Sequence, residues 1–326
     1  MARTEFAILG SGALGSILAA HLAAAGHAVV VLARGERARS IKEQGLRITG
    51  LAQIFTPVPV ITQPSELRAA EVLIVATKTP GTQAALERLR HVEVGVAFSV
   101  QNGVLKDELL ARTFGADRVL GALADTSGEL LPSGEVLFTR NVSLPLGELT
   151  GGTGRAARIA QVIDAAGIRS CAVPDIVARE WSKFTAWVSL MSLAVVTRSA
   201  TWRYLSDPDC ALVLVRITRE VARLAEALGV TLREEGILFP LGTVLRATEA
   251  DAVQAVRATG ERLRSDAPDH RMSSLQDLAA GRPLEVDETL GHAARRAAEL
   301  RLSLPLLEAM HRLVAGIDRL CAAGRC

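Results

Sequence analysis

The chain has few cysteines, and their spacing excludes the sites that cysteines most often build. Four occur among 326 residues, at positions 171, 210, 321 and 326, and no two of them form a C-x-x-C pair. Zinc sites and disulfide frameworks need characteristic cysteine spacings, and the six histidines are also scattered without ligand spacing. The sequence therefore predicts a reduced, cytoplasmic protein without a metal site.

Long apolar runs and a large charge of one sign are also missing. The longest apolar stretch covers residues 185–196, which is too short to span a bilayer and indicates a buried helix. The first strand pattern begins about five residues from the N-terminus, so we expect no secretory signal. The formal net charge is +2 and the basic residues do not cluster, so we expect no nucleic-acid partner and no membrane partner.

The apolar pattern changes near residue 172. Before it, short apolar runs at 6–9, 28–32, 72–76, 94–99 and 119–122 alternate with helical segments, as a doubly wound parallel sheet requires. Glycine and proline turns between residues 127 and 147 predict appended antiparallel strands. After Pro174, apolar residues recur every three or four positions, as at Ile217, Val221 and Leu224. We expect an α/β Rossmann-type domain over residues 1–172, followed by an all-α domain over 173–326.

A glycine motif lies between the first two apolar runs. It consists of Gly10, Ser11, Gly12, Ala13, Leu14 and Gly15. Between a strand and a helix, G-x-G-x-x-G indicates dinucleotide binding. The first glycine permits a tight turn, the second lets the backbone approach a pyrophosphate, and the third lets helix and strand pack closely. We therefore expect Gly10, Gly12, Ala13, Leu14 and Gly15 to contact the cofactor, with its phosphates at the helix N-terminus.

The end of the second strand pattern distinguishes NAD from NADP. NAD sites usually carry Asp or Glu there, but this chain has Arg34. A guanidinium group binds a 2′-phosphate through paired hydrogen bonds, so Arg34 favours NADP. Glu36 keeps an NAD interpretation open, although it lies two positions later and between Arg34 and Arg37. The other alternative is that Arg34 is a solvated loop charge.

Two further strand patterns end in polar side chains. Lys78 follows the third, and Gln101 and Asn102 follow the fourth. Because ligands bind outside the carboxyl ends of such strands, we expect Lys78 near the cofactor phosphates and Asn102 near the nicotinamide or the substrate. Asn102 also begins an Asn-Gly pair, so an ordinary turn residue is the alternative.

Together with two later segments, these residues resemble the ketopantoate reductase family (2-dehydropantoate 2-reductases) over nearly the whole chain. The later segments are residues 180–184, with the sequence EWSKF, and residues 273–287, which contain a Gln-Asp pair and end in GRPLEVD. The second segment is the most specific. The resemblance implies NADPH as cofactor, a Rossmann domain and a helical C-terminal domain.

The resemblance also implies residue roles. Lys183 would be the general acid and Glu285 its carboxylate partner, Asn102 would lie at the nicotinamide–substrate junction, and Ser273 would bind the substrate carboxylate. Hydride delivery to a ketone leaves negative charge on oxygen, which an ammonium group can polarise and protonate. Without the resemblance, Lys183 is more simply a snorkelling surface lysine and Ser273 a solvated serine.

The chain departs from the family where the substrate is expected. Trp187 and Met191 stand where the family usually has asparagines, four and eight residues after the lysine, and His270 stands where the late motif commonly begins with asparagine. Trp187 and Met191 share one helix face. Either they pack into the core beside a merely divergent pocket, or they form an apolar wall that suits a bulkier or less polar substrate. His270 could still supply a donor.

These observations predict an NADP-dependent oxidoreductase acting on CH–OH groups, which reduces a 2-oxo acid or a related ketone or imine between its domains. The expected substrate-site residues are Asn102, Lys183, Trp187, Met191, His270, Ser273 and Glu285. Authentic 2-dehydropantoate 2-reductase of pantothenate biosynthesis is one alternative, and a non-catalytic NADPH-binding sensor is another. Retention of both Lys183 and Glu285 argues against the sensor. Apolar residues 302–314 could form a homodimer interface, although core packing explains them equally well.

Overall fold

A computed structural model describes residues 4–234 and 238–324. By their contacts, the residues form two compact units. One comprises Met1–Asn102 and Lys106–Val177, and the other comprises Gly103–Leu105 and Ala178–Cys326. The main division therefore lies a few residues after the predicted boundary, and three residues of the predicted first domain belong to the helical unit.

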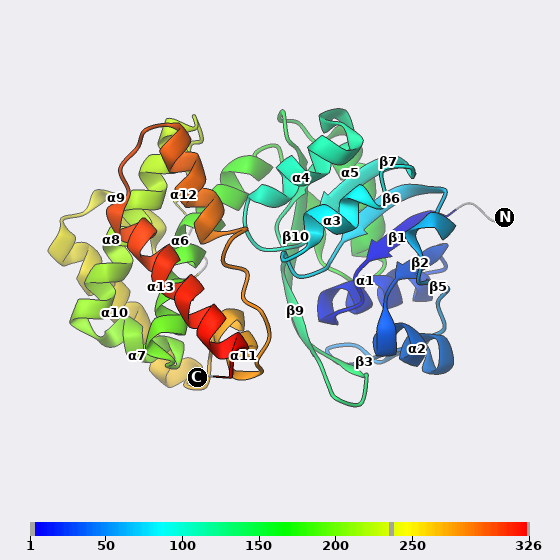
Figure 1. Cartoon of the computed structure of the whole chain (residues 1–326), viewed down its shortest axis with the longest axis horizontal. Coiled ribbons are helices and arrows are strands. Elements are labelled where there is room, and N and C mark those ends of the chain that lie inside the picture. The colour runs from blue at the N-terminus through cyan, green and yellow to red at the C-terminus, as the bar shows by residue number, and fades with distance from the viewer. Residues whose placement is uncertain (1–3, 235–237, 325–326) are drawn as a thin grey trace. The chain divides into compact units, whose positions relative to one another are not determined.

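The N-terminal unit contains a five-stranded parallel sheet of order β5-β2-β1-β6-β7 (Figure 1). Its strands are β1 (Phe6–Leu9), β2 (Val29–Leu32), β5 (Val60–Ile61), β6 (Ala69–Val75) and β7 (Glu93–Ser99). All residues of β1 and β2 are buried, as expected where both faces of a parallel sheet are covered.

The predicted strand at residues 119–122 is not the fifth strand of this sheet. Val119 alone bridges to Ala97 of β7. The following residues form β8 (Leu120–Ala122), which pairs antiparallel with a strand of a second sheet. The short β5 completes the parallel sheet at its other edge, beside β2. The pattern identified a strand correctly but could not show which strand it would pair with.

The second sheet is mixed and is organised around one long strand, β10 (Val136–Glu148). β8 and β9 (Asp125–Leu130) pair antiparallel with β10, whereas β3 (Leu46–Gly50) and β11 (Ser170–Ala172) pair parallel with it, and β4 (Ile54–Thr56) pairs with β3. The appended antiparallel strands are therefore confirmed. The β3–β4 hairpin was not predicted, because its alternating and half-exposed residues form no clear apolar run.

Five helices and two short 3-10 turns accompany the sheets. They are α1 (Ala13–Ala24), α2 (Gly35–Gln44), η1 (Pro64–Glu66), α3 (Thr82–Glu87), α4 (Leu105–Phe114), η2 (Ala116–Arg118) and α5 (Gly154–Ala165). α1 packs against β1 and β2 of the parallel sheet and against β3, β4, β9 and β10 of the mixed sheet. Ile17, Leu18 and Leu22 of α1 are fully buried. The glycine motif therefore leads into a helix that is fixed between the two sheets.

The regular secondary structure in the described residues of the C-terminal unit is all helical. Its helices are α6 (Ile176–Thr197), α7 (Thr201–Ser206), α8 (Pro208–Ala227), α9 (Leu241–Arg246), α10 (Glu249–Asp266), α11 (Ser273–Ala279), α12 (Leu290–Glu299) and α13 (Pro305–Ala322). α8 packs against α7, α9, α10, α12 and α13 (green to red in Figure 1). Asp207 is the N-cap residue of α8, and its carboxylate accepts hydrogen bonds from the backbone N–H groups of Asp209 and Cys210. These hydrogen bonds stabilise the start of the helix.

The α/β domain followed by an all-α domain is thus confirmed. In the segment considered for a homodimer interface, Leu304, Leu307 and Val314 are fully buried in the core. Among the described residues, no helix is long and apolar enough to cross a membrane.

Cysteine pairing differs from the expectation. Cys171 and Cys210 are free thiols, but Cys321 is disulfide-bonded. The expectation of a fully reduced chain therefore does not hold at Cys321. The described residues hold no group of three or more His, Cys, Asp or Glu side chains arranged to bind a metal.

Candidate active site

The glycine motif forms the turn between β1 and α1. Gly10 has a φ of +104°, and a Cβ atom there would lie 2.7 Å from the backbone nitrogen of Thr77. A Cβ on Gly15 would lie 2.0 Å from the carbonyl oxygen of Gly10, so these two positions require glycine. By contrast, a Cβ on Gly12 would meet no atom within 4 Å. The backbone at Gly12 therefore faces open space, as an approaching pyrophosphate needs.

The first turn of α1 begins at this open position. Ala13 and Leu14 are its first residues, and Gly12 is its N-cap, which makes no side-chain capping hydrogen bond. The first turn also carries no acidic residue. Its N–H groups and the positive end of the helix dipole are thus suited to an anion.

A cavity of about 380 Å³ adjoins the glycine turn. Its lining residues come from the ends of β1 and β2, from residues near β5 and from the segment after β6: Leu9, Gly10, Ser11, Leu32, Ala33, Arg34, Ile61, Thr62, Pro64, Thr77, Gly81, Ala84, Ala85 and Arg88. The lining is mainly apolar and includes two guanidinium groups, Arg34 and Arg88, and no carboxylate. This composition fits the adenosine moiety of a dinucleotide.

The charged residues around Arg34 have different positions. Arg34 is exposed and is the N-cap residue of α2, whereas Glu36 is exposed and does not line the cavity. Arg37 does not line it either, because its guanidinium group is bound within the fold. Arg88 was not predicted. The sequence feature that could have indicated Arg88 is its position directly after the helix that follows β6.

Lys78 and Asn102 follow the carboxyl ends of β6 and β7. These strands pair in parallel, with Val75 opposite Ser99, so the two segments leave the same edge of the sheet. Lys78 is exposed and Asn102 is half-buried. The prediction that both lie at this edge agrees with the strand pairing, whereas their contacts with a ligand remain predictions.

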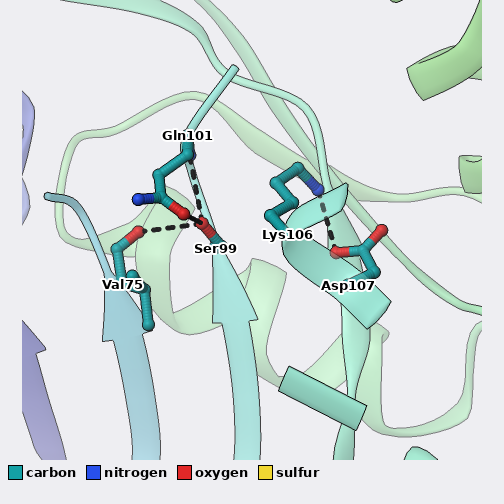
Figure 2. A network of polar contacts seen from close by, with 5 residues as sticks. All are labelled: Val75, Ser99, Gln101, Lys106 and Asp107. Carbon is teal, nitrogen blue, oxygen red and sulfur yellow. Dashed lines mark hydrogen bonds and ion pairs between the residues drawn. The ribbon is translucent and has the colours of Figure 1, made fainter. Parts of the chain in front are cut away.

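A buried ion pair in the first turn of α4, shortly after Asn102, was not predicted. Lys106 Nζ lies 3.0 Å from Asp107 Oδ1, and the side chains are 2% and 11% exposed (Figure 2). Lysine is unfavourable in the first turn of a helix, where the dipole favours anions. The negative charge of Asp107 therefore interacts favourably with both the ammonium group of Lys106 and the positive N-terminal end of the α4 dipole.

In the C-terminal unit, the two predicted catalytic residues come from separate segments. Lys183 is half-buried on α6, and Glu285 is buried, with 7% exposure, between α11 and α12. The hydroxyl group of Thr289 donates a hydrogen bond to the carbonyl oxygen of Glu285. Burial raises the pKa of the nearby Glu288 carboxyl, and the charges of Asp287 and Glu285 act in the same direction. Arg295 opposes this rise in the pKa of Glu288, and His311 Nε2 lies 3.3 Å from Asp287 Oδ1.

The remaining predicted substrate residues differ in exposure. Trp187 and Met191 on α6 are buried, with 9% and 1% exposure. His270 is exposed, and its Nδ1 lies 3.0 Å from Thr201 Oγ1 at the start of α7. Ser273 is half-buried at the start of α11. The next residue, Ser274, has a buried hydroxyl group for which the described residues provide no hydrogen-bond partner.

Comparison with known proteins identifies the family. The profile described as ketopantoate reductase PanE/ApbA matches residues 6–151, and the profile of that family's C-terminal domain matches residues 175–318. The chain belongs to the ketopantoate reductase family. It is therefore an oxidoreductase that acts on CH–OH groups and uses a nicotinamide cofactor.

Individual relatives match over almost their whole length. A 2-dehydropantoate 2-reductase from Archaeoglobus fulgidus is 29% identical over 314 residues, which cover 95% of this chain and 97% of the relative. The crystal structure of 2-dehydropantoate 2-reductase from Geobacter metallireducens has a TM-score of 0.81 at 25% identity, with 96% and 99% of the two chains covered. D-mandelate dehydrogenase, solved with NADH and anilino(oxo)acetate, shares the fold, with a TM-score of 0.82 at 17% identity and coverage of 98% and 99%.

Proposed function

We propose that this member of the family is an NADPH-dependent reductase of a 2-oxo acid, or of a related ketone or imine, with Lys183 as the proton donor. The observation that carries the proposal is the pairing of two features in one chain. One is the cavity beside the glycine turn, whose charged lining residues are both arginines. The other is the retention of a half-buried ammonium and a buried carboxylate, Lys183 and Glu285, in the helical unit.

NADPH supplies the hydride when it is bound. The first turn of α1 would hold its pyrophosphate, and Arg34 its 2′-phosphate, with Lys78 adding positive charge nearby. Asn102 would orient the nicotinamide and the carbonyl compound. Lys183 would polarise the carbonyl oxygen and then donate a proton to it, while Glu285 keeps the ammonium group oriented. Ser273 would bind the substrate carboxylate.

The apolar residues on α6 bear on the choice of substrate. Trp187 and Met191 replace amide side chains that would hydrogen-bond a polar substrate, and a site that loses such partners loses discrimination for the hydroxyl group they bind. We propose that the pocket is therefore more apolar and accepts a bulkier 2-oxo acid. Reduction of 2-dehydropantoate itself is the second candidate, because the relative from A. fulgidus carries that name.

The test is NADPH oxidation with 2-dehydropantoate, with branched 2-oxo acids and with aromatic 2-oxo acids. Lys183→Ala should lower kcat by about 100- to 10,000-fold, the usual contribution of a general acid. Lys42→Ala removes an exposed lysine on α2 and serves as the matched control. Full turnover by the Lys183 variant would contradict the assignment of the proton donor.

The substrate class is tested in the same assay. Trp187→Asn and Met191→Asn restore amides and should raise kcat/KM for 2-dehydropantoate relative to the bulkier acids. Efficient turnover of 2-dehydropantoate by the unchanged enzyme would instead favour the second candidate. NADPH binding without turnover of any compound in the panel would favour a sensor.

A further inference from the structure

The side-chain amide of Gln101 joins the segments that follow β6 and β7. Its Oε1 accepts a hydrogen bond from Ser99 Oγ at 2.9 Å (Figure 2). Its Nε2 lies 2.7 Å from Thr82 Oγ1, 3.0 Å from the carbonyl oxygen of Thr77 and 3.1 Å from Thr77 Oγ1. Both ends of the amide are therefore used within the fold, so the amide itself is committed to structure rather than to a ligand.

These contacts extend into both neighbouring segments. Thr82 Oγ1 donates a hydrogen bond to the carbonyl oxygen of Lys78 at 3.2 Å. Ser99 Oγ lies 3.3 Å from the carbonyl oxygen of Val75 and accepts a hydrogen bond from the backbone N–H of Gln101 at 3.2 Å. One side chain thus connects the last residue of β7 to both ends of the segment from Thr77 to Thr82.

Three of the four side chains in this network are buried, and the fourth, Thr77, is half-buried. Ser99 is 1% exposed, Thr82 3% and Gln101 9%. Water therefore cannot readily replace a lost partner, and hydrogen bonds at low dielectric are directional and costly to break. A buried amide with its donors and acceptor engaged holds its backbone in one conformation.

We propose that Gln101 is a positioning residue that fixes the backbone at the end of β7 and thereby orients the side chain of Asn102. Asn102 is the next residue along the chain, and the turn that Gln101 binds contains Lys78. Gln101 would thus set the distance between two groups of the proposed cofactor site. These are the side-chain amide of Asn102, expected near the nicotinamide, and the ammonium group of Lys78, expected near the phosphates. The orientation of Asn102 can be measured without turnover, whereas its effect on turnover rests on the proposed function.

The asparagine content of the chain allows a direct test. The sequence contains two asparagines, Asn102 and Asn141. Selective ¹⁵N-asparagine labelling therefore yields two pairs of side-chain amide signals, one pair from each NH₂ group, and Asn102→Asp assigns them by deletion. Asn141 is an internal reference, because its own amide is held by the carbonyl oxygen of Gly167 and the backbone N–H of Arg169.

Gln101→Leu keeps the approximate size of the side chain but removes the amide. We expect the Asn102 signal to shift and broaden in this variant, and its shift on addition of NADP⁺ to be lost, while the Asn141 signal stays in place. Gln101→Glu should behave similarly near neutral pH, because a carboxylate cannot donate to the carbonyl oxygen of Thr77. Gln161→Leu, on the exposed face of α5, is the matched control and should leave both signals unchanged.

Kinetics distinguishes positioning from a merely structural role. If positioning is correct, Gln101→Leu should lower kcat about 10- to 100-fold, while its affinity for NADPH, measured by NADPH fluorescence well below the melting temperature, changes less than about threefold (0.65 kcal/mol at RT ≈ 0.59 kcal/mol). An Asn102 signal unchanged by Gln101→Leu, or a kcat within about twofold of the unchanged enzyme, would overturn the proposal. If the unchanged enzyme reduces no compound in the panel, the proposed function fails, and the Asn102 signal still decides whether Gln101 positions that residue.

Discussion

Arg37 Nε donates a hydrogen bond to the carbonyl oxygen of Ser11, within the glycine turn, at 3.0 Å. The other two guanidinium nitrogens donate to the carbonyl oxygen of Gly134 at 2.7 Å and to Ser16 Oγ at 2.9 Å. Burial lowers the pKa of Arg37, and these three oxygens compensate for part of the lost hydration. Of the two arginines near the end of β2, one therefore stabilises the turn and the other is available to a ligand.

Arg37→Met should destabilise the N-terminal unit and weaken cofactor binding. Hydrogen bonds to a charged group are worth about 1.5–3 kcal/mol each and are not additive, so we expect a loss of about 2–3 kcal/mol in the free energy of unfolding, measured by urea denaturation. NADPH and NADH affinities should fall by similar factors, because the turn serves both cofactors. A selective loss of NADPH binding would show that Arg37 contacts the 2′-phosphate instead.

Arg34→Ser should have the opposite pattern. Arg34 is exposed and makes the cavity positive without supporting the turn. Loss of a charge-assisted contact to phosphate should raise the KM for NADPH about 10- to 100-fold and change the KM for NADH little, with an unchanged melting temperature. Equal effects on the two cofactors would contradict NADP recognition by Arg34.

The Lys106–Asp107 pair should be strongly coupled. Removing one partner of a buried ion pair leaves an uncompensated charge and costs about 3–5 kcal/mol, so Lys106→Met and Asp107→Leu should each be severely destabilising. The double variant should lose less than the sum, because neither member of the pair is left facing a missing partner. A double-mutant cycle in urea measures this coupling, and additive losses would show that the pair is energetically independent.

His21 should make stability depend on pH. It is 6% exposed, its Nδ1 lies 2.8 Å from the carbonyl oxygen of Ala166, and its Nε2 has no partner among the described residues. Burial lowers its pKa, and the hydrogen bond with Ala166 opposes this only in part. The unfolded chain then binds the proton more tightly. The stabilising effect is therefore complete above about pH 6.5, the unfolded value, and is lost as the pH falls through the lower folded value.

His21→Gln keeps a donor for Ala166 but does not titrate. Urea midpoints measured at several pH values from neutral to mildly acidic should fall less steeply for this variant than for the unchanged protein. His91→Gln, at an exposed histidine whose Nε2 lies 3.2 Å from the carbonyl oxygen of Leu67, is the matched control for the exchange of histidine for glutamine. Parallel curves for the unchanged protein and His21→Gln would rule out His21 as the titrating group.

The local sequence pattern was sufficient to predict those structural features that depend only on neighbouring residues. The strand, glycine turn and helix at residues 6–24 follow from a buried run, Gly10 and an apolar helix, and the switch to helical spacing after Pro174 predicted the second unit. These features need no knowledge of distant partners, because backbone conformation and amphipathic period are properties of short segments.

Features that join distant segments could not be predicted in this way. Arg34 and Arg37 lie three positions apart, and nothing in the sequence showed that Arg37 binds Gly134, almost one hundred residues away. Gln101 likewise finds its acceptors at Thr77 and Thr82, and residues 120–122 pair with β10 rather than with the parallel sheet.

The sequence by itself therefore determined the element types, the glycine turn and the candidate charges. The tertiary structure decided which of those charges are bound within the fold and which are exposed to a ligand. The physical reason is that a buried polar group must find a partner, and which partner is within reach depends on how distant segments pack.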